Sequence, residues 1–169
     1  MQTNDDVTIR EFIAGDEEAF YRLNEEWIVR LFAMEPRDEE IIRNPRRIIL
    51  DRGGRIFFAI RNGEPIGCCA LLPTEAGEYE LSKMAVTESC RGAGLGRRIL
   101  ERVIAEARAS GATRLYLETN HQLEPAIHLY ESVGFRHIPP ERKAASPYAR
   151  SDVSMELYFT SAHRETSAG

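Results

Sequence analysis

A glycine-rich segment, Arg91–Leu100 (RGAGLGRRIL), places three glycines at alternate positions directly before a helical pattern. Glycine loses more backbone freedom on folding than any other residue, so three glycines at a helix start need a reason. Backbone N–H groups that converge at a helix N-terminus bind anions well. The segment therefore predicts a strand–loop–helix unit that binds a phosphate group. A turn without a ligand would explain one glycine, but not three beside Arg91, Arg97 and Arg98.

Two familiar phosphate-binding loops do not fit this spacing. A P-loop ends in a lysine followed by a hydroxyl residue, and neither is present. A dinucleotide-binding fingerprint needs G-x-G-x-x-G, and counted from Gly92 its third glycine falls on Arg97. Glu118, at the end of the next predicted strand, would suit a Rossmann unit, but that unit would begin only halfway along the chain. The segment is interpreted as a pyrophosphate cradle built by the N–H groups of residues 92–96.

Length, charge and composition limit the number of domains and the kinds of partner that this chain can have. The 169 residues predict one domain over residues 1–169, with a core over about 7–159 and a flexible tail at 160–169. The net charge of -5 argues against a nucleic-acid partner and leaves room for an acidic pocket that receives amines. No apolar run reaches the length of a membrane span, residues 1–7 lack a signal-peptide pattern, and the three cysteines match no disulfide or metal motif. We expect a reduced, cytoplasmic protein without metal or membrane partner.

Hydrophobic periodicity predicts an α/β arrangement. Alternating patterns indicate strands at Val7–Phe12, Arg55–Ile60, Glu64–Pro73, Glu78–Val86 and Arg114–Asn120, followed by two more in GFRHI and DVSMELYF. Helical stripes start at Asp16, cover Glu39–Leu50 with a break at Pro45, follow the glycine loop to about Ala109, and lie between Pro125 and Gly134. The Asn-Gly pair between the second and third strands predicts a tight hairpin turn.

Two motifs resemble one known family. KMAVTESCRGAGLGRRILERVIAEA is similar to motif A of the GCN5-related N-acetyltransferase (GNAT) superfamily, whose loop Q/R-x-x-G-x-G/A is matched by Arg91, Gly94 and Gly96. LYLETN followed by PAIHLYESVGF resembles motif B, and the chain is most similar to a widespread, uncharacterised bacterial branch. The resemblance implies the GNAT fold: a mixed, mostly antiparallel sheet of about seven strands, splayed at a central β-bulge and flanked by about four helices.

The resemblance also implies a cofactor, acetyl-CoA, and acetyl transfer to a primary amine of a small molecule, peptide or protein. It assigns backbone contacts with pantetheine to residues 84–86, diphosphate contacts to the glycine loop, and a further contact to Asn120. The predicted cofactor-binding residues are Met84, Ala85, Val86, Arg91, Gly92, Ala93, Gly94, Leu95, Gly96, Arg97 and Asn120. Arg97 and Arg98 would either contact phosphate or face solvent.

Acetyl transfer to an amine needs a base and an acid. The amine attacks only when it is neutral, so a carboxylate must take its proton. Glu80 is the predicted base, and the period of a strand places it on one face with Ser82 and Met84. Glu78 or a water network is the alternative. Tyr130 is predicted to protonate the departing thiolate, because a phenol of pKa about 10 holds its proton more tightly than a thiol of about 8.5.

The acceptor pocket is predicted to contain Glu26, Trp27 and Tyr148, from the first helix and the loop before the last strand. Trp27 is otherwise a core residue, the commoner fate of a lone tryptophan on an apolar helix stripe. Two function classes stay open at this point: an N-acetyltransferase that works by direct attack in a ternary complex, and an acetyl-CoA-binding regulatory module without turnover. A homodimer is a further expectation, because GNAT domains often pair.

Overall fold

The computed structural model describes residues 6–159, and over this range the chain forms a seven-stranded sheet in the order β1-β2-β3-β4-β5-β7-β6. The strands are Val7–Glu11 (β1), Arg55–Arg61 (β2), Glu64–Pro73 (β3), Glu78–Val86 (β4), Arg114–Thr119 (β5), Arg136–His137 (β6) and Val153–Tyr158 (β7). Neighbouring strands in the described range run antiparallel, apart from the parallel pair of β4 and β5. The predicted mixed, mostly antiparallel sheet is confirmed.

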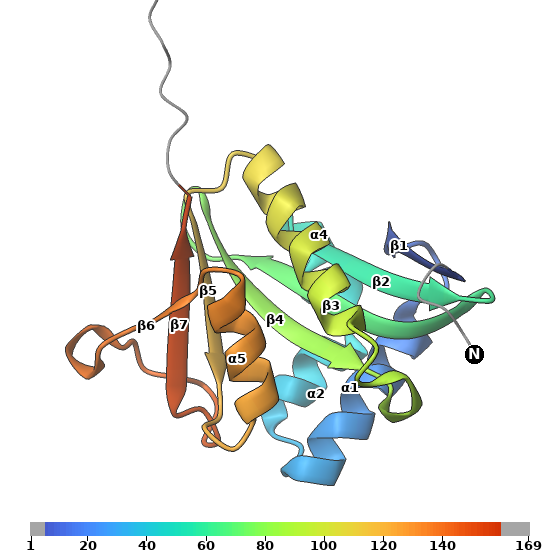
Figure 1. Ribbon diagram of the computed structural model, residues 1–169, viewed down its shortest axis with the longest axis horizontal. Coiled ribbons are helices and arrows are strands. Elements are labelled where there is room, and N and C mark those ends of the chain that lie inside the picture. The colour runs from blue at the N-terminus through green and yellow to red at the C-terminus, as the bar shows by residue number, and fades with distance from the viewer. Residues whose placement is uncertain (1–5, 160–169) are drawn as a thin grey trace, which may run out of the picture.

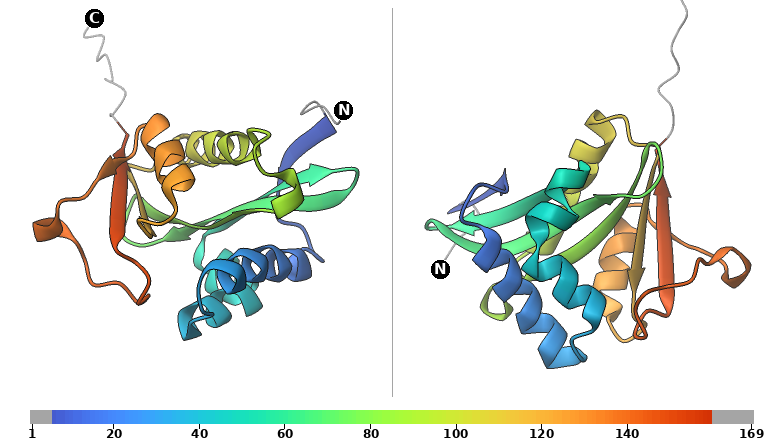
Figure 2. Two further views of the ribbon diagram at one scale, coloured as in Figure 1. Left: turned by 60° about the horizontal axis from the view of Figure 1, so that its bottom comes forward. Right: turned by 180° about the vertical axis from the view of Figure 1, so that it is seen from behind.

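Helices cover both faces of this sheet (Figures 1 and 2). Helices α4 (Leu95–Ala109) and α5 (Glu124–Ser132) lie on one face, and α1 (Glu17–Leu31), α2 (Pro36–Arg43) and α3 (Pro45–Ile48) lie on the other. Three short 3-10 turns occur at Leu50–Arg52, Glu88–Cys90 and Pro140–Arg142. Residues 6–159 hold five α-helices, in line with the expected number of about four; the predicted patch at Glu39–Leu50 forms two of them in part, because the chain leaves helical geometry at Asn44 and restarts with Pro45.

The sheet divides the interior into two apolar clusters. Helix α4 buries a stripe against one face of the sheet, and this stripe consists of Leu95, Ile99, Leu100, Val103, Ile104 and Ala107. On the other face, α1 and α2 bury Phe20, Leu23, Ile28, Ile41 and Ile42. Trp27 is only partly buried at the edge of this second cluster. The two clusters hold α1 and α4 on opposite sides of the middle strands.

The middle of the sheet opens at a β-bulge in β4. Strands β4 and β5 pair only over Glu78–Glu80 and Arg114–Tyr116, and then diverge. On the other side of β4, Ala70 faces Ser82 while Cys68 faces Ala85, so β4 carries one residue more than β3 between these pairs. The backbone accommodates the extra residue at Lys83, which has a φ of 53°. The expected splay at a central bulge is confirmed.

The bulge also changes which face each β4 side chain takes. Leu81 and Met84 are an odd number of residues apart, yet both belong to the apolar cluster beneath α4 and α5. Glu80 lies on the opposite face, where Lys83 and Arg37 influence it electrostatically. The prediction that Met84 shares a strand face with Glu80 and Ser82 is therefore wrong, because the extra residue reverses the alternation beyond Ser82.

Some expectations fall outside what the structure describes. Residues 1–5 and the predicted flexible tail at 160–169 lie beyond the described residues. Within residues 6–159, no helix has the length and apolar character needed to cross a bilayer, and no group of three or more His, Cys, Asp or Glu side chains is placed to hold a metal ion. A single domain, a cytoplasmic location and a homodimer stay predictions.

Gly67 on β3 offers a test of how closely α4 packs on the sheet. A Cβ at this position would lie 2.7 Å from Cδ1 of Ile99 and 3.1 Å from the carbonyl oxygen of Ala85. We expect Gly67→Val to lower the free energy of unfolding by about 2–3 kcal/mol, because α4 or β4 must move. Urea denaturation measures this change.

The control is Gly63→Asn in the β2–β3 turn. Gly63 has a φ of 75°, which asparagine tolerates, and a Cβ at this position would have no neighbouring atom within 4 Å. We expect a loss below about 1 kcal/mol. Equal losses for both variants would show that α4 does not depend on the missing side chain at Gly67.

Candidate active site

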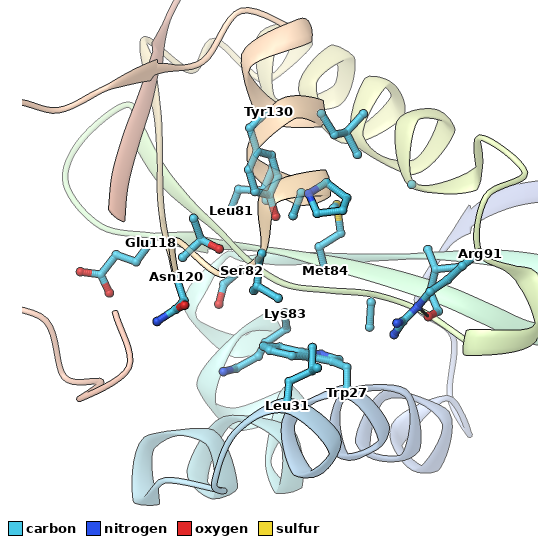
Figure 3. A pocket seen from close by; sticks show the side chains of 18 of the residues that line it. Trp27, Leu31, Leu81, Ser82, Lys83, Met84, Arg91, Glu118, Asn120 and Tyr130 are labelled. Atoms are coloured by element: carbon cyan, nitrogen blue, oxygen red, sulfur yellow. Dashed lines mark hydrogen bonds between the residues drawn. The ribbon is translucent and has the colours of Figure 1, made fainter. Parts of the chain in front are cut away.

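A cavity of about 630 Å³ lies where β4 and β5 diverge (Figure 3). Its walls come from the end of α1, β4, the glycine loop with the start of α4, the end of β5, α5, and the loop before β7. Predicted site residues in its lining are Trp27, Glu80, Met84, Ala85, Val86, Arg91, Gly92, Gly94, Leu95, Gly96, Arg97, Asn120, Tyr130 and Tyr148. Residues predicted from distant parts of the sequence therefore converge on one cavity.

The glycine loop forms one end of the cavity. Gly92 and Gly94 have φ values of 80° and 73°, a conformation that other residues rarely adopt. The first helical hydrogen bond of α4 runs from the N–H of Arg98 to the carbonyl of Gly94, and no described side chain caps this helix. The N–H groups of residues 95–97 therefore have no helical acceptor and can bind an anion. This end of the cavity fits the diphosphate of coenzyme A.

Gly96 has a different role from the other loop glycines. A Cβ on Gly96 would lie 3.3 Å from Cδ2 of Leu129 in α5, tighter than most such contacts. Gly96 thus lets α4 and α5 approach closely beside the loop. Ala93 does not belong to the cavity lining formed by the described residues, although it was predicted as a cofactor-binding residue.

The arginines around the loop take separate positions. Arg91 lines the cavity and its Nε donates to the carbonyl of Val86 at 3.2 Å. Arg97 also lines the cavity while contacting Glu101 and Ser132. Arg98 donates to the carbonyl of Val7 at 2.9 Å, which ties α4 to β1. The sequence left open whether Arg97 and Arg98 contact phosphate or face solvent. Arg97 remains a candidate phosphate ligand, whereas Arg98 connects α4 to β1.

Two carboxylates meet where β4 and β5 separate, those of Glu80 and Glu118. Burial, together with the charge of Glu118, raises the pKa of Glu80 to about 7. Glu118 is held by the Tyr116 hydroxyl, which donates to it at 2.7 Å, and by the Ser146 hydroxyl at 2.9 Å. Glu80 can thus accept a proton near neutral pH while Glu118 stays fixed beside it. The sequence placed Glu118 at a strand end but did not assign it to this site.

Glu78, the alternative base, has a different environment. Its carboxylate accepts a hydrogen bond from Arg114 at 3.3 Å, in the section where β4 and β5 still pair. It is not among the described residues that line the cavity. The geometry favours Glu80 over Glu78 as the group that could take a proton from a ligand.

Tyr130 lines the cavity from α5. The side chain is 7% exposed and packs edge-on against Phe135, with ring centroids 5.9 Å apart. Figure 3 shows its hydroxyl directed into the cavity between the ends of β4 and β5. Burial raises the pKa of Tyr130 above its usual value, so the phenol keeps its proton and can donate it.

Asn120 fixes the loops around the cavity. Its Nδ2 donates to the carbonyl of Arg150 at 2.8 Å, and its Oδ1 accepts from the N–H of Gln122 at 2.8 Å. Asn120 was predicted to contact the cofactor from the facing strand end. It does line the cavity, but its amide joins the end of β5 to the loop before β7.

A buried ion-pair network forms the end of the cavity opposite the glycine loop. The ammonium of Lys83 donates to Asp38 at 2.7 Å and to the Tyr148 hydroxyl at 3.1 Å. The guanidinium of Arg150 binds both Asp38 oxygens at 2.6 Å. Burial alone would raise the pKa of Asp38, but Arg150 and Lys83 lower it to about 2. Sequence reasoning missed this network; a lysine in the middle of a central strand was its only signal.

Glu26 lies away from this network. Its carboxylate accepts hydrogen bonds from the N–H of Glu88 at 2.8 Å and from the Thr87 hydroxyl at 3.2 Å. Neither oxygen reaches the wall that the described residues form around the cavity. Glu26, predicted as an acceptor-binding residue, instead joins α1 to the segment between β4 and the glycine loop. Trp27 and Tyr148, the other two predicted acceptor residues, do line the cavity.

Comparisons with known proteins agree with the family resemblance seen in the sequence. The sequence model of the family described as "Acetyltransferase (GNAT) family" matches residues 16–135. A curated relative, the IAA acetyltransferase of Azospirillum brasilense, is 38% identical over 102 residues, which make up 60% of this chain. The aligned part spans 64% of that relative's own length.

Solved structures share the fold. An acetyltransferase of the GNAT family from Staphylococcus aureus superimposes with a TM-score of 0.81 at 20% identity, covering 90% of this chain and 98% of that chain. The yncA acetyltransferase of Salmonella typhimurium, solved with acetyl-CoA, superimposes with a TM-score of 0.70 at 23% identity, covering 90% and 93% of the two chains. At these identities the likeness concerns the fold.

Replacing Gly94 tests the cradle. Gly94→Val forces a β-branched side chain into a φ of 73°, which distorts the loop and redirects its N–H groups. We expect the dissociation constant for acetyl-CoA to rise at least about tenfold, because several charge-assisted hydrogen bonds are lost together. Isothermal titration calorimetry measures it.

Gly111→Val is the matched control for this prediction. Gly111 follows the other end of α4 with a φ of 84°, so the substitution introduces similar backbone strain far from the cavity. We expect a lower melting temperature with unchanged acetyl-CoA affinity. Unchanged affinity in Gly94→Val as well would contradict the assignment of the cradle.

Proposed function

The chain belongs to the acetyltransferase (GNAT) family, and from this membership we propose that it transfers the acetyl group of acetyl-CoA to a primary amine by direct attack in a ternary complex. The observation that carries the proposal is the convergence of three groups on one cavity: the glycine cradle, Glu80 and Tyr130. Each serves a separate requirement of this reaction. The cradle holds the cofactor, the carboxylate takes the proton of the amine, and the phenol serves the departing sulfur.

The chain offers binding groups for two parts of the cofactor, its diphosphate and its pantetheine arm. Bound acetyl-CoA supplies an activated thioester. The N–H groups at the start of α4 have no helical acceptor and would hold the diphosphate. Beyond Glu80, the edge of β4 that faces β5 has lost its ladder partners, so residues 82–86 can bond the pantetheine amides in their place. This is how Met84, Ala85 and Val86 would bind the cofactor through their backbone.

Glu80 is proposed to accept the proton of the acceptor amine, directly or through a water molecule. Its neighbours are Glu118 on β5, Lys83 on β4 and Arg37 on α2, and their balance with burial leaves its pKa at about 7. An acid of this pKa is largely ionised at slightly alkaline pH and can then accept the ammonium proton. Glu118 accepts hydrogen bonds from the hydroxyls of Tyr116 and Ser146, which hold its carboxylate in place beside Glu80.

Tyr130 is proposed to donate a hydrogen bond or a proton to the sulfur of the leaving thiolate. Its position on α5 directs the hydroxyl toward the point where β4 and β5 part (Figure 3). The apolar surroundings that raise its pKa keep it protonated until charge develops on the sulfur.

Glu80→Gln tests the base. We expect kcat/KM to fall by about 10²–10⁴, the usual contribution of a general base. In the unchanged protein the rate should rise with pH through about 7, because only the ionised carboxylate accepts a proton. In the variant this limb of the pH–rate profile should disappear. A retained limb would show that another group is the base.

The free energy of unfolding shows whether a loss of activity in Glu80→Gln comes from the missing base or from a misfolded protein. Since folding raises the pKa of Glu80, its ionised form destabilises the fold, and this penalty is present above the unfolded pKa of about 4.5 and fully developed above about 7. Glu80→Gln should therefore increase the free energy of unfolding at pH 8, by about 3 kcal/mol, and change it little at pH 4. Denaturant titrations at the two pH values measure this.

Tyr130→Phe tests the acid. The ring still packs against Phe135, so we expect the acetyl-CoA dissociation constant to change less than about twofold while kcat falls about tenfold to a hundredfold. Release of free thiol in the presence of an amine panel gives kcat, and calorimetry gives the binding constant. An equal loss in both would make Tyr130 a structural residue.

The same thiol-release assay separates the two function classes. Turnover with any amine supports the transferase. A protein whose melting temperature rises with acetyl-CoA, but which releases no thiol across polyamines, amino acids, aminoglycosides and peptides, would fit a regulatory module instead.

A further inference from the structure

We propose that the acceptor is a small amino acid, with its amine and carboxylate close together and an apolar side chain, and that Lys83 and Arg150 bind the carboxylate. The inference rests on the proposed function, since it names the substrate class of that same cavity. It is carried by the distribution of charge over the wall opposite the glycine loop, which has a negative and a positive part.

The negative part consists of Glu80 and Glu118, and the positive part consists of Lys83 and Arg150; all four line the cavity. The carboxylates that balance the two cations are those of Asp38 and Glu35, and neither belongs to the described lining. Asp38 is fully buried behind the cations and binds both of them. The cations Lys83 and Arg150 therefore face the cavity, whereas the carboxylates Asp38 and Glu35 that neutralise them do not line it.

Both cations keep hydrogen-bond donors for a ligand. An ammonium has three N–H groups, and Lys83 uses two of them, on Asp38 and Tyr148. A guanidinium has five, and Arg150 uses three of them, on Asp38 and Glu35. The side chain of Lys83 is 3% exposed and that of Arg150 is 15% exposed. A carboxylate that reaches these donors would form charge-assisted bonds to cations that are already fixed in place.

The bulge brings the two parts of the wall together. Glu80 and Lys83 are three residues apart, which in a regular strand would place them on opposite faces. The extra residue in β4 turns Lys83 to the face of Glu80, as its bond to Asp38 on α2 shows. Glu80 and Lys83 both line the cavity, and the charge of Lys83 acts on Glu80. One small ligand that carries both an amine and a carboxylate can therefore contact both groups.

The remaining wall is apolar. Trp27, Leu31 and Phe32, at the end of α1, line the cavity. Figure 3 shows Trp27 and Leu31 on the side of Lys83. Leu31 is 44% exposed, so a ligand that covers it would bury apolar surface. A diamine would place its second ammonium against Lys83 and Arg150, and a peptide would present a neutral amide there. The wall therefore disfavours both alternatives.

Matched sets of acceptors test this inference: L-leucine, L-leucinamide and 3-methylbutylamine, and likewise L-phenylalanine, L-phenylalaninamide and 2-phenylethylamine. Thiol release from acetyl-CoA gives kcat/KM for each. We expect the amino acid of at least one set to exceed its amide and its amine about tenfold or more, because a buried site built for a polar group rejects analogues without it. An amide or amine as good as the amino acid in both sets would overturn the proposal.

Variants assign the preference to the cations. In Lys83→Met, KM for the amino acid should rise about tenfold or more while KM for the matched amine does not rise, so the preference falls below about threefold. A merely structural lysine would impair both acceptors alike, which would overturn the assignment. Arg142→Gln is the matched control: it lies in the same loop as Arg150 and pairs with the buried Glu156, away from this cavity. It should keep the preference.

Tyr148→Phe is a second variant should Lys83→Met not fold. It removes only the hydroxyl that binds Lys83, and it should raise the amino-acid KM about threefold with the amine unaffected. Both KM values unchanged, or raised together, would count against the proposal.

Equilibrium binding keeps the inference separate from the proposed function. Calorimetry with the same six compounds is carried out on the complex of the protein with coenzyme A. Preferential binding of an amino acid without thiol release would support the carboxylate site and contradict the transferase. Turnover of other amines, with no preference for the amino acids, would support the transferase and overturn the carboxylate site. No binding and no turnover of either amino acid would also overturn it.

Discussion

The bulge in β4 is the constraint on which the other features of this protein depend. One extra residue, Lys83, sits in a left-handed conformation in the middle of a buried sheet, where such a residue costs roughly 1–2 kcal/mol. The bulge lies just beyond Glu80, where the pairing of β4 with β5 ends and the cavity begins, so the edge of β4 there is free for a ligand. It also moves a lysine to the face of Glu80. The ion pair of Lys83 with Asp38 and the packing of Met84 on the other face hold the bulge in this form.

The cavity has two ends that use different physical means. At the glycine loop, the proposed binding groups are backbone N–H groups at the start of α4, so side chains matter mainly where they must be absent. At the other end, the proposed binding groups are held by charged side chains from three separate elements, α2, β4 and the loop before β7. Substitutions at the acceptor end can therefore change the ligand without disturbing the cofactor site. This division lets one fold serve many acceptors.

Two carboxyl groups at the acceptor end, those of Glu80 and Asp38, have pKa values shifted in opposite directions by their surroundings. Glu80 is buried beside another carboxylate, and its pKa rises to about 7; Asp38 is buried between two cations, and its pKa falls to about 2. The first carboxyl is thereby ready to exchange a proton near neutral pH, and the second is permanently charged. Removing one partner of the Asp38 network would leave an uncompensated buried charge, which is more destabilising than loss of an exposed pair.

Local signals in the sequence determined the strands, the helix stripe of α4, the Asn62-Gly63 turn and the glycine loop, because turn chemistry and periodicity act over a few residues. With the family resemblance, they also predicted a set of cofactor-binding residues, most of which line the cavity. The face of Met84, the position of Glu26 beside Glu88, and the network of Asp38, Lys83 and Arg150 were decided only by tertiary structure. A bulge is set by the register between two strands, and a buried ion pair by elements far apart in the chain. Neither leaves a periodic pattern in the residues themselves.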